Sequence, residues 1–134
     1  MPSEIQIAPA SKPLLWTGRI LSILAVLFML FDTVGHLLKP APVVQAFAQL
    51  DFPLRLSVVI GIIQLICLIL YVIPRTAVLG AVLLTGYLGG AVAIHMRVGN
   101  PLFECLFPII IGVLFWTGLL LRDHRLRAIF PVSS

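Results

Sequence analysis

The sequence predicts an all-α integral membrane protein, in which four transmembrane helices form an up-down antiparallel bundle. Of its 134 residues, 60% are hydrophobic and only 10% are charged, whereas a soluble globular domain usually carries about 25% charged residues. The mean hydropathy is +1.14. Because so few charged side chains cannot cover the surface of a water-soluble domain, the chain is expected to lie in a lipid bilayer.

Four apolar runs are long enough to cross that bilayer. They cover residues 14–38, 56–73, 76–96 and 102–121. A helix rises about 1.5 Å per residue, so runs of about 20 residues match a hydrocarbon core of about 30 Å. Lipid offers the backbone no hydrogen-bond partners, which requires each run to be helical. Short loops join the last three runs, so those neighbours are expected to be antiparallel.

The first run follows an N-terminal tail, residues 1–13, and is most apolar over residues 20–31. A cleaved signal peptide is the alternative interpretation, because residues 46–48 have the small-x-small form of a cleavage site. That site lies well beyond the apolar run, however, and Asp32, His36 and Lys39 intervene. The first run is therefore expected to be a retained transmembrane helix.

The later elements are bounded by proline and by basic residues. Between the first two runs, the stretch PVVQAFAQL is expected to form a short amphipathic turn or helix on the membrane surface. Pro74 and Arg75 end the second run, and Pro108 interrupts the fourth. Residues 122–134 begin with the sequence RDHRLR and are expected to form a basic tail.

Glycines in the second and third runs are candidates for close helix packing. Gly86 and Gly90 form a G-x-x-x-G pair, and Gly61 lies in the second run. Small residues let helices approach closely, and close packing drives helix association in lipid. We expect these three positions to lie at helix–helix contacts of a compact bundle. A homo-oligomer is a candidate assembly of the protein.

The basic residues indicate how the bundle is oriented. One set of tails and loops carries six Lys and Arg residues, namely Lys12, Arg19, Arg75, Arg122, Arg125 and Arg127, whereas the other loops carry three. Cytoplasmic loops are enriched in Lys and Arg, so both termini are expected in the cytoplasm. No contiguous basic block is present, and nucleic-acid binding is not predicted.

Ionisable residues inside transmembrane runs mark candidate functional sites. Here they come from all four runs, with one neutral amide among them: Asp32, His36, Gln64, His95 and Glu104. Counting residues from the run ends places all of them in the outer half of the bundle, and Asp32 and His36 are one turn apart on the same face. The sequence therefore predicts a shared polar cavity that opens to the outside.

Each of these residues also has a purely structural interpretation. Asp32 and His36 could be a hydrogen-bonded pair that fixes packing, and Gln64 could link helices. His95 could be an ordinary interfacial residue, and Glu104 could be a first-turn acid favoured by the helix dipole. The agreement in depth favours a site that relays protons or binds the head of a quinone or another small lipid-soluble molecule. No metal site is predicted, because spacing such as H-x-x-x-H is absent.

Three segments resemble the DoxX-like membrane proteins: FDTVGHLLKP (31–40), VVIGIIQLICLILYVIP (58–74) and GYLGGAVAIHMRVGNP (86–101). The resemblance extends over about residues 15–121. It implies a four-helix membrane bundle and a location near quinol, thiosulfate or quinone redox chemistry. The positions that match the family pattern are Gly35, His36, Gly61, Gln64, Gly90 and His95. Gln64 stands where the family often has Glu, which argues against proton transfer through that position.

The resulting hypothesis is a DoxX-like component of a bacterial inner membrane that is tied to redox or quinone metabolism. In it, His36 and His95 exchange protons, Asp32 orients His36, Gln64 hydrogen-bonds the ligand and Glu104 lies at the rim. Electrons would come from a membrane or redox protein partner. The alternatives are a non-enzymatic membrane subunit or assembly factor, and an oligomeric small-molecule transporter. Whether the protein is an enzyme stays open at this point.

Overall fold

The computed structural model describes residues 12–129, and all the regular secondary structure in that range is helical. The long helices α1, α3, α4 and α5 cover Lys12–Leu38, Ser57–Val72, Ala77–Arg97 and Leu102–Arg122. The short helices α2 and α6 cover Ala41–Gln49 and His124–Ile129, and a 3₁₀ turn, η1, covers Leu54–Leu56. The all-α prediction is confirmed for the described residues.

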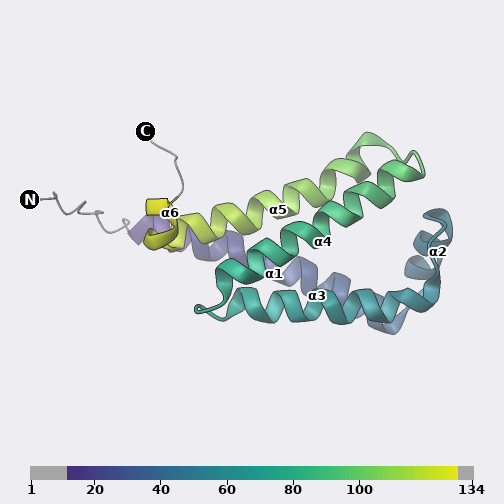
Figure 1. The fold of residues 1–134 in the computed structure, drawn as a ribbon, viewed down its shortest axis with the longest axis horizontal. Coiled ribbons are helices and arrows are strands. Elements are labelled where there is room, and N and C mark those ends of the chain that lie inside the picture. The colour runs from purple at the N-terminus through teal and green to yellow at the C-terminus, as the bar shows by residue number, and fades with distance from the viewer. Residues whose placement is uncertain (1–11, 130–134) are drawn as a thin grey trace, which may run out of the picture.

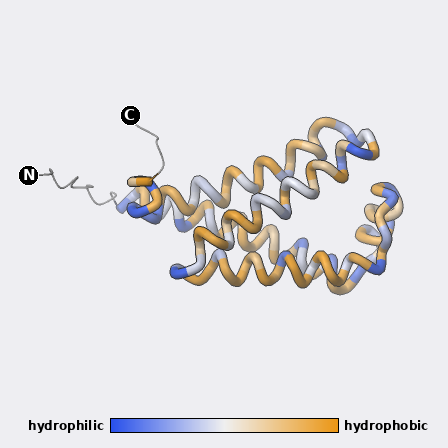
Figure 2. The backbone as a smooth tube through the Cα atoms, viewed as in Figure 1, coloured by the Kyte–Doolittle hydropathy of each residue, from blue (hydrophilic) through white to orange (hydrophobic). Residues whose placement is uncertain are grey.

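The four long helices are the predicted membrane spans. Each is long and apolar enough to cross a membrane, α3 together with the η1 turn that precedes it. Each begins and ends within two residues of the apolar run predicted for it. Figure 2 shows hydrophobic residues along the whole length of all four helices. The prediction of four transmembrane helices is therefore confirmed.

The four helices form a closed ring. α1 packs against α3 and α5, and α4 packs against the same two helices. In Figure 1 the chain runs along the bundle in α1 and then reverses its direction before each of the next three long helices. This course and these contacts fit the predicted up-down order.

α2 lies across one end of the bundle, where α1 ends and α3 begins (Figure 1). Its first turn contains Pro42, whose missing N–H costs nothing at that position. On either side of α2 the backbone is left-handed, at Lys39 (φ 53°) and Asp51 (φ 50°), a conformation that non-glycine residues adopt rarely. These two positions turn the chain into and out of α2, and Phe47 is the buried residue of the helix. The expected amphipathic segment is thus a helix.

Polar groups inside the bundle form hydrogen bonds with one another, because lipid offers them no hydrogen-bond partners. Tyr71 is 1% exposed; its hydroxyl donates to the carbonyl oxygen of Phe115 (2.8 Å) and lies 3.0 Å from Oγ of Ser22. These contacts tie α3 to α5 and α1. The outward faces of the long helices carry exposed Leu, Ile, Val and Phe side chains, as expected for surfaces in contact with lipid.

Helices approach one another closely at several glycines. Of the three predicted glycines, only Gly61 lies at such a contact. A Cβ added at Gly61 would lie 3.0 Å from Cβ of His36, so α3 approaches α1 closely there. A Cβ at Gly80 would collide with the backbone of Tyr71. A Cβ at Gly86 or Gly90 would meet nothing within 4 Å. Within the described chain, α3 and α4 therefore meet at Gly80, and the expected contact at Gly86 and Gly90 is not made.

The two predicted tails contain helical residues. α1 already begins at Lys12, and residues 1–11 lie outside the described range. After α5 ends at Arg122, Oδ1 of Asp123 accepts the backbone N–H of Arg125 (2.9 Å) and starts α6. This is the capping that Asp favours at a helix start. Residues 130–134 of the predicted basic tail also lie outside the described range.

Candidate functional site

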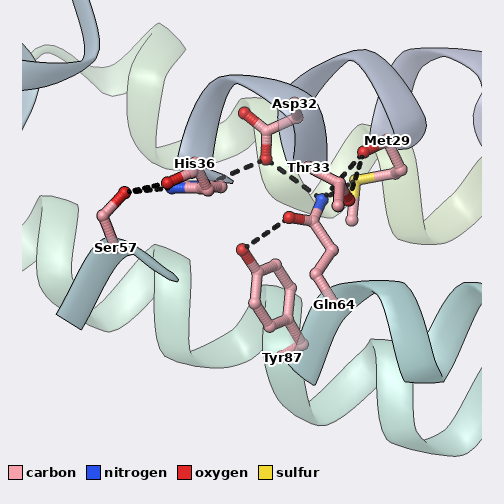
Figure 3. A network of polar contacts seen from close by, with 7 residues as sticks. All are labelled: Met29, Asp32, Thr33, His36, Ser57, Gln64 and Tyr87. Carbon is pink, nitrogen blue, oxygen red and sulfur yellow. Dashed lines mark hydrogen bonds and ion pairs between the residues drawn. The ribbon is translucent and has the colours of Figure 1, made fainter. Parts of the chain in front are cut away.

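The site begins with a pair on α1. Nε2 of His36 lies 3.3 Å from Oδ2 of Asp32, one helical turn away. The His36 side chain is 15% exposed and the Asp32 side chain 43%. The i, i+4 spacing had predicted this neighbourhood, because residues four apart lie on the same helix face. Figure 3 shows the pair pointing from α1 toward α3 and α4.

Gln64 joins this pair to two other helices. It is fully buried at 0% exposure. Its Nε2 donates to Oδ2 of Asp32 (3.1 Å) and to the carbonyl oxygen of Met29 (3.2 Å), and its Oε1 accepts the hydroxyl hydrogen of Tyr87 (3.2 Å). The three hydrogen bonds link α3 to α1 and α4 (Figure 3).

Gln64 is therefore placed differently from the sequence hypothesis, which had it bind the ligand. Its donor and its acceptor are both used inside the protein, and it does not line the pocket described below. Its role in the geometry is to hold the carboxylate of Asp32 and the hydroxyl of Tyr87 in fixed positions.

Ser57 fixes His36 from the start of α3. Its Oγ donates to the carbonyl oxygen of His36 (2.7 Å) and lies 3.5 Å from Nδ1 of the imidazole. Sequence reasoning did not include Ser57 or Tyr87 among the site residues. A signal for Ser57 was present, because Ser57, Gly61 and Gln64 lie at helical spacing and share one face of α3.

Asp32, His36 and Tyr87 border a pocket of about 450 Å³ whose walls come from α1, α3, α4, α5 and α2. Its polar lining comes from Asp32, His36, Tyr87 and His95. The rest of the lining is apolar or glycine and includes Phe28, Val43, Phe47, Ile60, Phe107 and Ile111. An apolar pocket of this size with a few converging polar groups is the usual form of a small-molecule site.

Two polar atoms on the pocket lining are still available for a ligand. Within residues 12–129, no hydrogen bond reaches Oδ1 of Asp32 or Nε2 of His95. The amide nitrogen of Asn100 lies 2.7 Å from the other ring nitrogen of His95, Nδ1, and holds the ring. The pocket thus offers a free carboxylate oxygen and a free imidazole nitrogen in an apolar surrounding.

α2 forms one wall of the pocket. Its Phe47 ring packs edge-on against the imidazole of His36, with ring centroids 5.7 Å apart. Arg97, at the end of α4, donates from Nη2 to the carbonyl oxygens of Leu50 (2.9 Å) and Asp51 (3.1 Å), directly after α2. The guanidinium therefore fastens the C-terminal end of α2 to α4.

Replacing Arg97 with glutamine should loosen α2. The change removes two charge-assisted hydrogen bonds from an exposed position, which amounts to about 1–2 kcal/mol. Hydrogen–deuterium exchange of residues 41–49 should then be about 5–30-fold faster than in the unmodified protein. Arg55→Gln is the matched control, because the Arg55 side chain is exposed and makes no hydrogen bond in the described chain. Equal exchange in both variants would mean that Arg97 does not hold α2.

Glu104 is not part of this pocket. It lies exposed in the first turn of α5, its side chain makes no hydrogen bond or ion pair within residues 12–129, and it is absent from the pocket lining. The structure thus joins Asp32, His36 and Gln64 directly and puts His95 on the same pocket wall, but leaves Glu104 apart. Among the described residues, no group of three or more His, Cys, Asp or Glu side chains could hold a metal ion.

Comparison with known proteins identifies the family. The sequence profile of the DoxX-like family matches residues 20–118, a range that includes Asp32, His36, Gln64, Tyr87 and His95. No curated protein and no solved structure matches the chain. The match covers well over half of the sequence and agrees with the four membrane-spanning helices of the fold. The chain therefore belongs to the DoxX-like family.

Proposed function

We propose that this protein binds a lipid-soluble molecule of the quinone class in the pocket beneath α2, as a membrane component of redox metabolism. The observation that carries this proposal is the free Oδ1 of Asp32 in an apolar pocket of about 450 Å³. A quinone or quinol combines an apolar ring with oxygens that accept or donate hydrogen bonds. The apolar ring would contact the apolar side chains of the pocket lining, and the oxygens would contact its polar side chains.

The polar residues would act on the oxygens of the bound ring. Oδ1 of Asp32 accepts the hydrogen of a quinol hydroxyl, and Nε2 of His95 donates to a carbonyl oxygen or takes a proton from a hydroxyl. Reduction of a quinone to a quinol takes up two protons and two electrons. His95 can exchange protons with the ligand directly and His36 through the carboxylate of Asp32, and the electrons must come from a membrane or redox protein partner.

The charge distribution supports a particular orientation of the pocket. The α2 end carries three Lys and Arg residues in its loops, against six at the other end. By the positive-inside preference, both termini lie in the cytoplasm and the pocket lies in the outer half of a bacterial inner membrane. A ligand would then reach the pocket from the outer leaflet.

Quinone binding tests the proposal directly. The purified protein in detergent micelles is titrated with a short-chain ubiquinone analogue, and lipids extracted from the purified protein are analysed for quinones. Asp32→Asn and His95→Ala should each weaken binding about 10–100-fold, because each removes a hydrogen bond of about 1.5–3 kcal/mol to a charged or buried group. Thr117→Val is the matched control, since Thr117 lies in a separate groove between α4 and α5. Unchanged affinity in both pocket variants would refute the proposal.

A second candidate is a non-enzymatic membrane subunit in which the polar cluster serves packing. The hydrogen bonds of Gln64 to Met29, Asp32 and Tyr87 favour it, because they tie three helices together without a ligand. On this alternative, Asp32→Asn, His36→Ala and His95→Ala would each lower the amount of protein in the membrane. On the quinone proposal, Asp32→Asn and His95→Ala accumulate normally and lose the ligand.

A further inference from the structure

The end of the bundle opposite α2 contains buried donors that lack acceptors. Nε and Nη2 of Arg122 and the same two atoms of Arg127 are buried and have no hydrogen-bond partner. Within residues 12–129 these are the only buried side-chain nitrogen or oxygen atoms in that condition. Buried polar groups in native proteins are nearly always hydrogen-bonded, and a buried charged group without a partner is costly. The four atoms therefore indicate an acceptor that the described chain does not supply.

In each arginine the unpartnered atoms form the same edge of the guanidinium. Nε and Nη2 lie side by side and donate two parallel N–H groups, which fit two oxygens of one phosphate or carboxylate. A lone N–H could be explained by a bridging water. Both arginines leave this bidentate edge without a partner. The missing acceptor is therefore expected to be an oxyanion.

Among residues 12–129, packing rather than an ion pair holds Arg122 in place. Its Cζ lies 5.0 Å from the ring centroid of Tyr71, and that ring is fixed by the hydrogen bonds of its hydroxyl to Phe115 and Ser22. The buried Leu126 anchors α6 against the bundle, so Arg127 also stays at this end. The site is thus built on side chains of the bundle core.

The chain offers little negative charge to these arginines. Within the described residues, Asp123 is the one acid at this end, and its Oδ1 already accepts the backbone N–H groups of Arg125 (2.9 Å) and Leu126 (3.4 Å). The other charged residues that the structure describes at this end are all basic: Lys12, Arg19, Arg75 and Arg125. This surplus attracts an anion from outside the chain.

The position along the helix identifies the kind of anion. Arg122 is the last residue of a 21-residue membrane-spanning helix, so its guanidinium lies at the depth of the lipid headgroups. The acceptors that are abundant at this depth are lipid phosphates. We infer that Arg122 and Arg127 form a binding site for the phosphate of an anionic phospholipid at the corner between α5 and α6.

Lipid binding to the full chain tests this inference. The protein in maltoside micelles is mixed with phosphatidylglycerol, phosphatidylcholine or inorganic phosphate, and bound lipid is counted by native mass spectrometry. Phosphatidylglycerol should bind at least about tenfold more tightly than phosphatidylcholine, and Arg122→Gln or Arg127→Gln should each remove about tenfold of that affinity. Arg125→Gln is the matched control: it removes the same charge from the same short helix, but its side chain is exposed. That control should leave the affinity within about twofold.

Other outcomes would overturn the inference. An equal loss of phosphatidylglycerol affinity in Arg125→Gln would show that the lipid is attracted only diffusely to a basic surface. Competition by inorganic phosphate at the concentration of the lipid would indicate a site for free anions. A gain in lipid affinity in Glu4→Gln would identify Glu4, which precedes the described residues, as the occupant. Should Arg122→Gln fail to accumulate, Arg122→Lys keeps the charge and removes the bidentate edge, and it should still lose about tenfold.

Discussion

Replacing Gln64 with leucine should lower the free energy of unfolding by about 2–4 kcal/mol. The leucine fills a similar volume, so the expected loss comes from hydrogen bonds and not from a cavity. Oδ2 of the half-buried Asp32 side chain would lose one donor, and the hydroxyl of Tyr87 would lose its acceptor. A polar group left unpaired inside the protein costs about 1–3 kcal/mol.

Unfolding in mixed micelles with an increasing fraction of dodecyl sulfate, followed by circular dichroism, would measure this change. Gln49→Leu is the matched control, because Gln49 is exposed on α2 and makes no side-chain hydrogen bond in the described chain. A Gln64→Leu variant as stable as Gln49→Leu would mean that the network does not hold the three helices together.

The same variant also separates the two roles proposed for the site. Gln64 does not line the pocket, so a loss of quinone affinity in Gln64→Leu would arise through Asp32 and Tyr87, which it positions. Gln64→Asn keeps the amide but is one methylene shorter. If quinone binding depends on how Gln64 positions Asp32 and Tyr87, Gln64→Asn should weaken quinone binding but lose less stability than Gln64→Leu.

The sequence predicted the helices and the depth of the polar residues because both follow from counting. The length of each apolar run predicts a membrane-spanning helix. The fixed rise per residue of a helix then places Asp32, His36 and His95 near one end of the bundle. Counting also placed Glu104 at that end, yet its side chain is exposed and outside the pocket. The direction in which a side chain points around the helix axis depends on how neighbouring helices pack, and an apolar pattern on all sides does not reveal it.

Packing also decided which glycines matter. The G-x-x-x-G spacing drew attention to Gly86 and Gly90, whereas the backbones of α3 and α4 meet at Gly80. These two helices are joined by the tight turn at Pro74 and Arg75, so they are closest near that turn and diverge toward the pocket end, as Figure 1 shows. The pocket lies where the helices diverge, and Gly90 is on its lining. Sequence spacing alone does not tell which end of a helical hairpin is the closed one.

Replacing Gly80 with valine should therefore be more damaging than the same change at Gly86. A Cβ at Gly80 would lie 2.6 Å from Cα of Tyr71; because that neighbour is backbone, the helices themselves must separate. Overpacking of this kind costs about 1–3 kcal/mol or more. Separation would also displace the Tyr71 ring, on which Ser22, Phe115 and Arg122 depend. We expect a loss of about 3 kcal/mol in the mixed-micelle assay.

Gly86→Val is the matched control on the same helix, because a Cβ there meets nothing within 4 Å. Its stability should stay within about 0.5 kcal/mol of the unmodified protein, as for most surface substitutions. If Gly86→Val proves the more harmful, the surface around Gly86 and Gly90 must pack against something outside this chain. Cross-linking in membranes would then distinguish the two candidates: a homo-oligomer that disappears in Gly86→Val places a second copy there, and an unchanged pattern places a lipid there. A Gly80→Val variant as stable as the unmodified protein would contradict the close approach of α3 and α4 on which the closed end of the bundle depends.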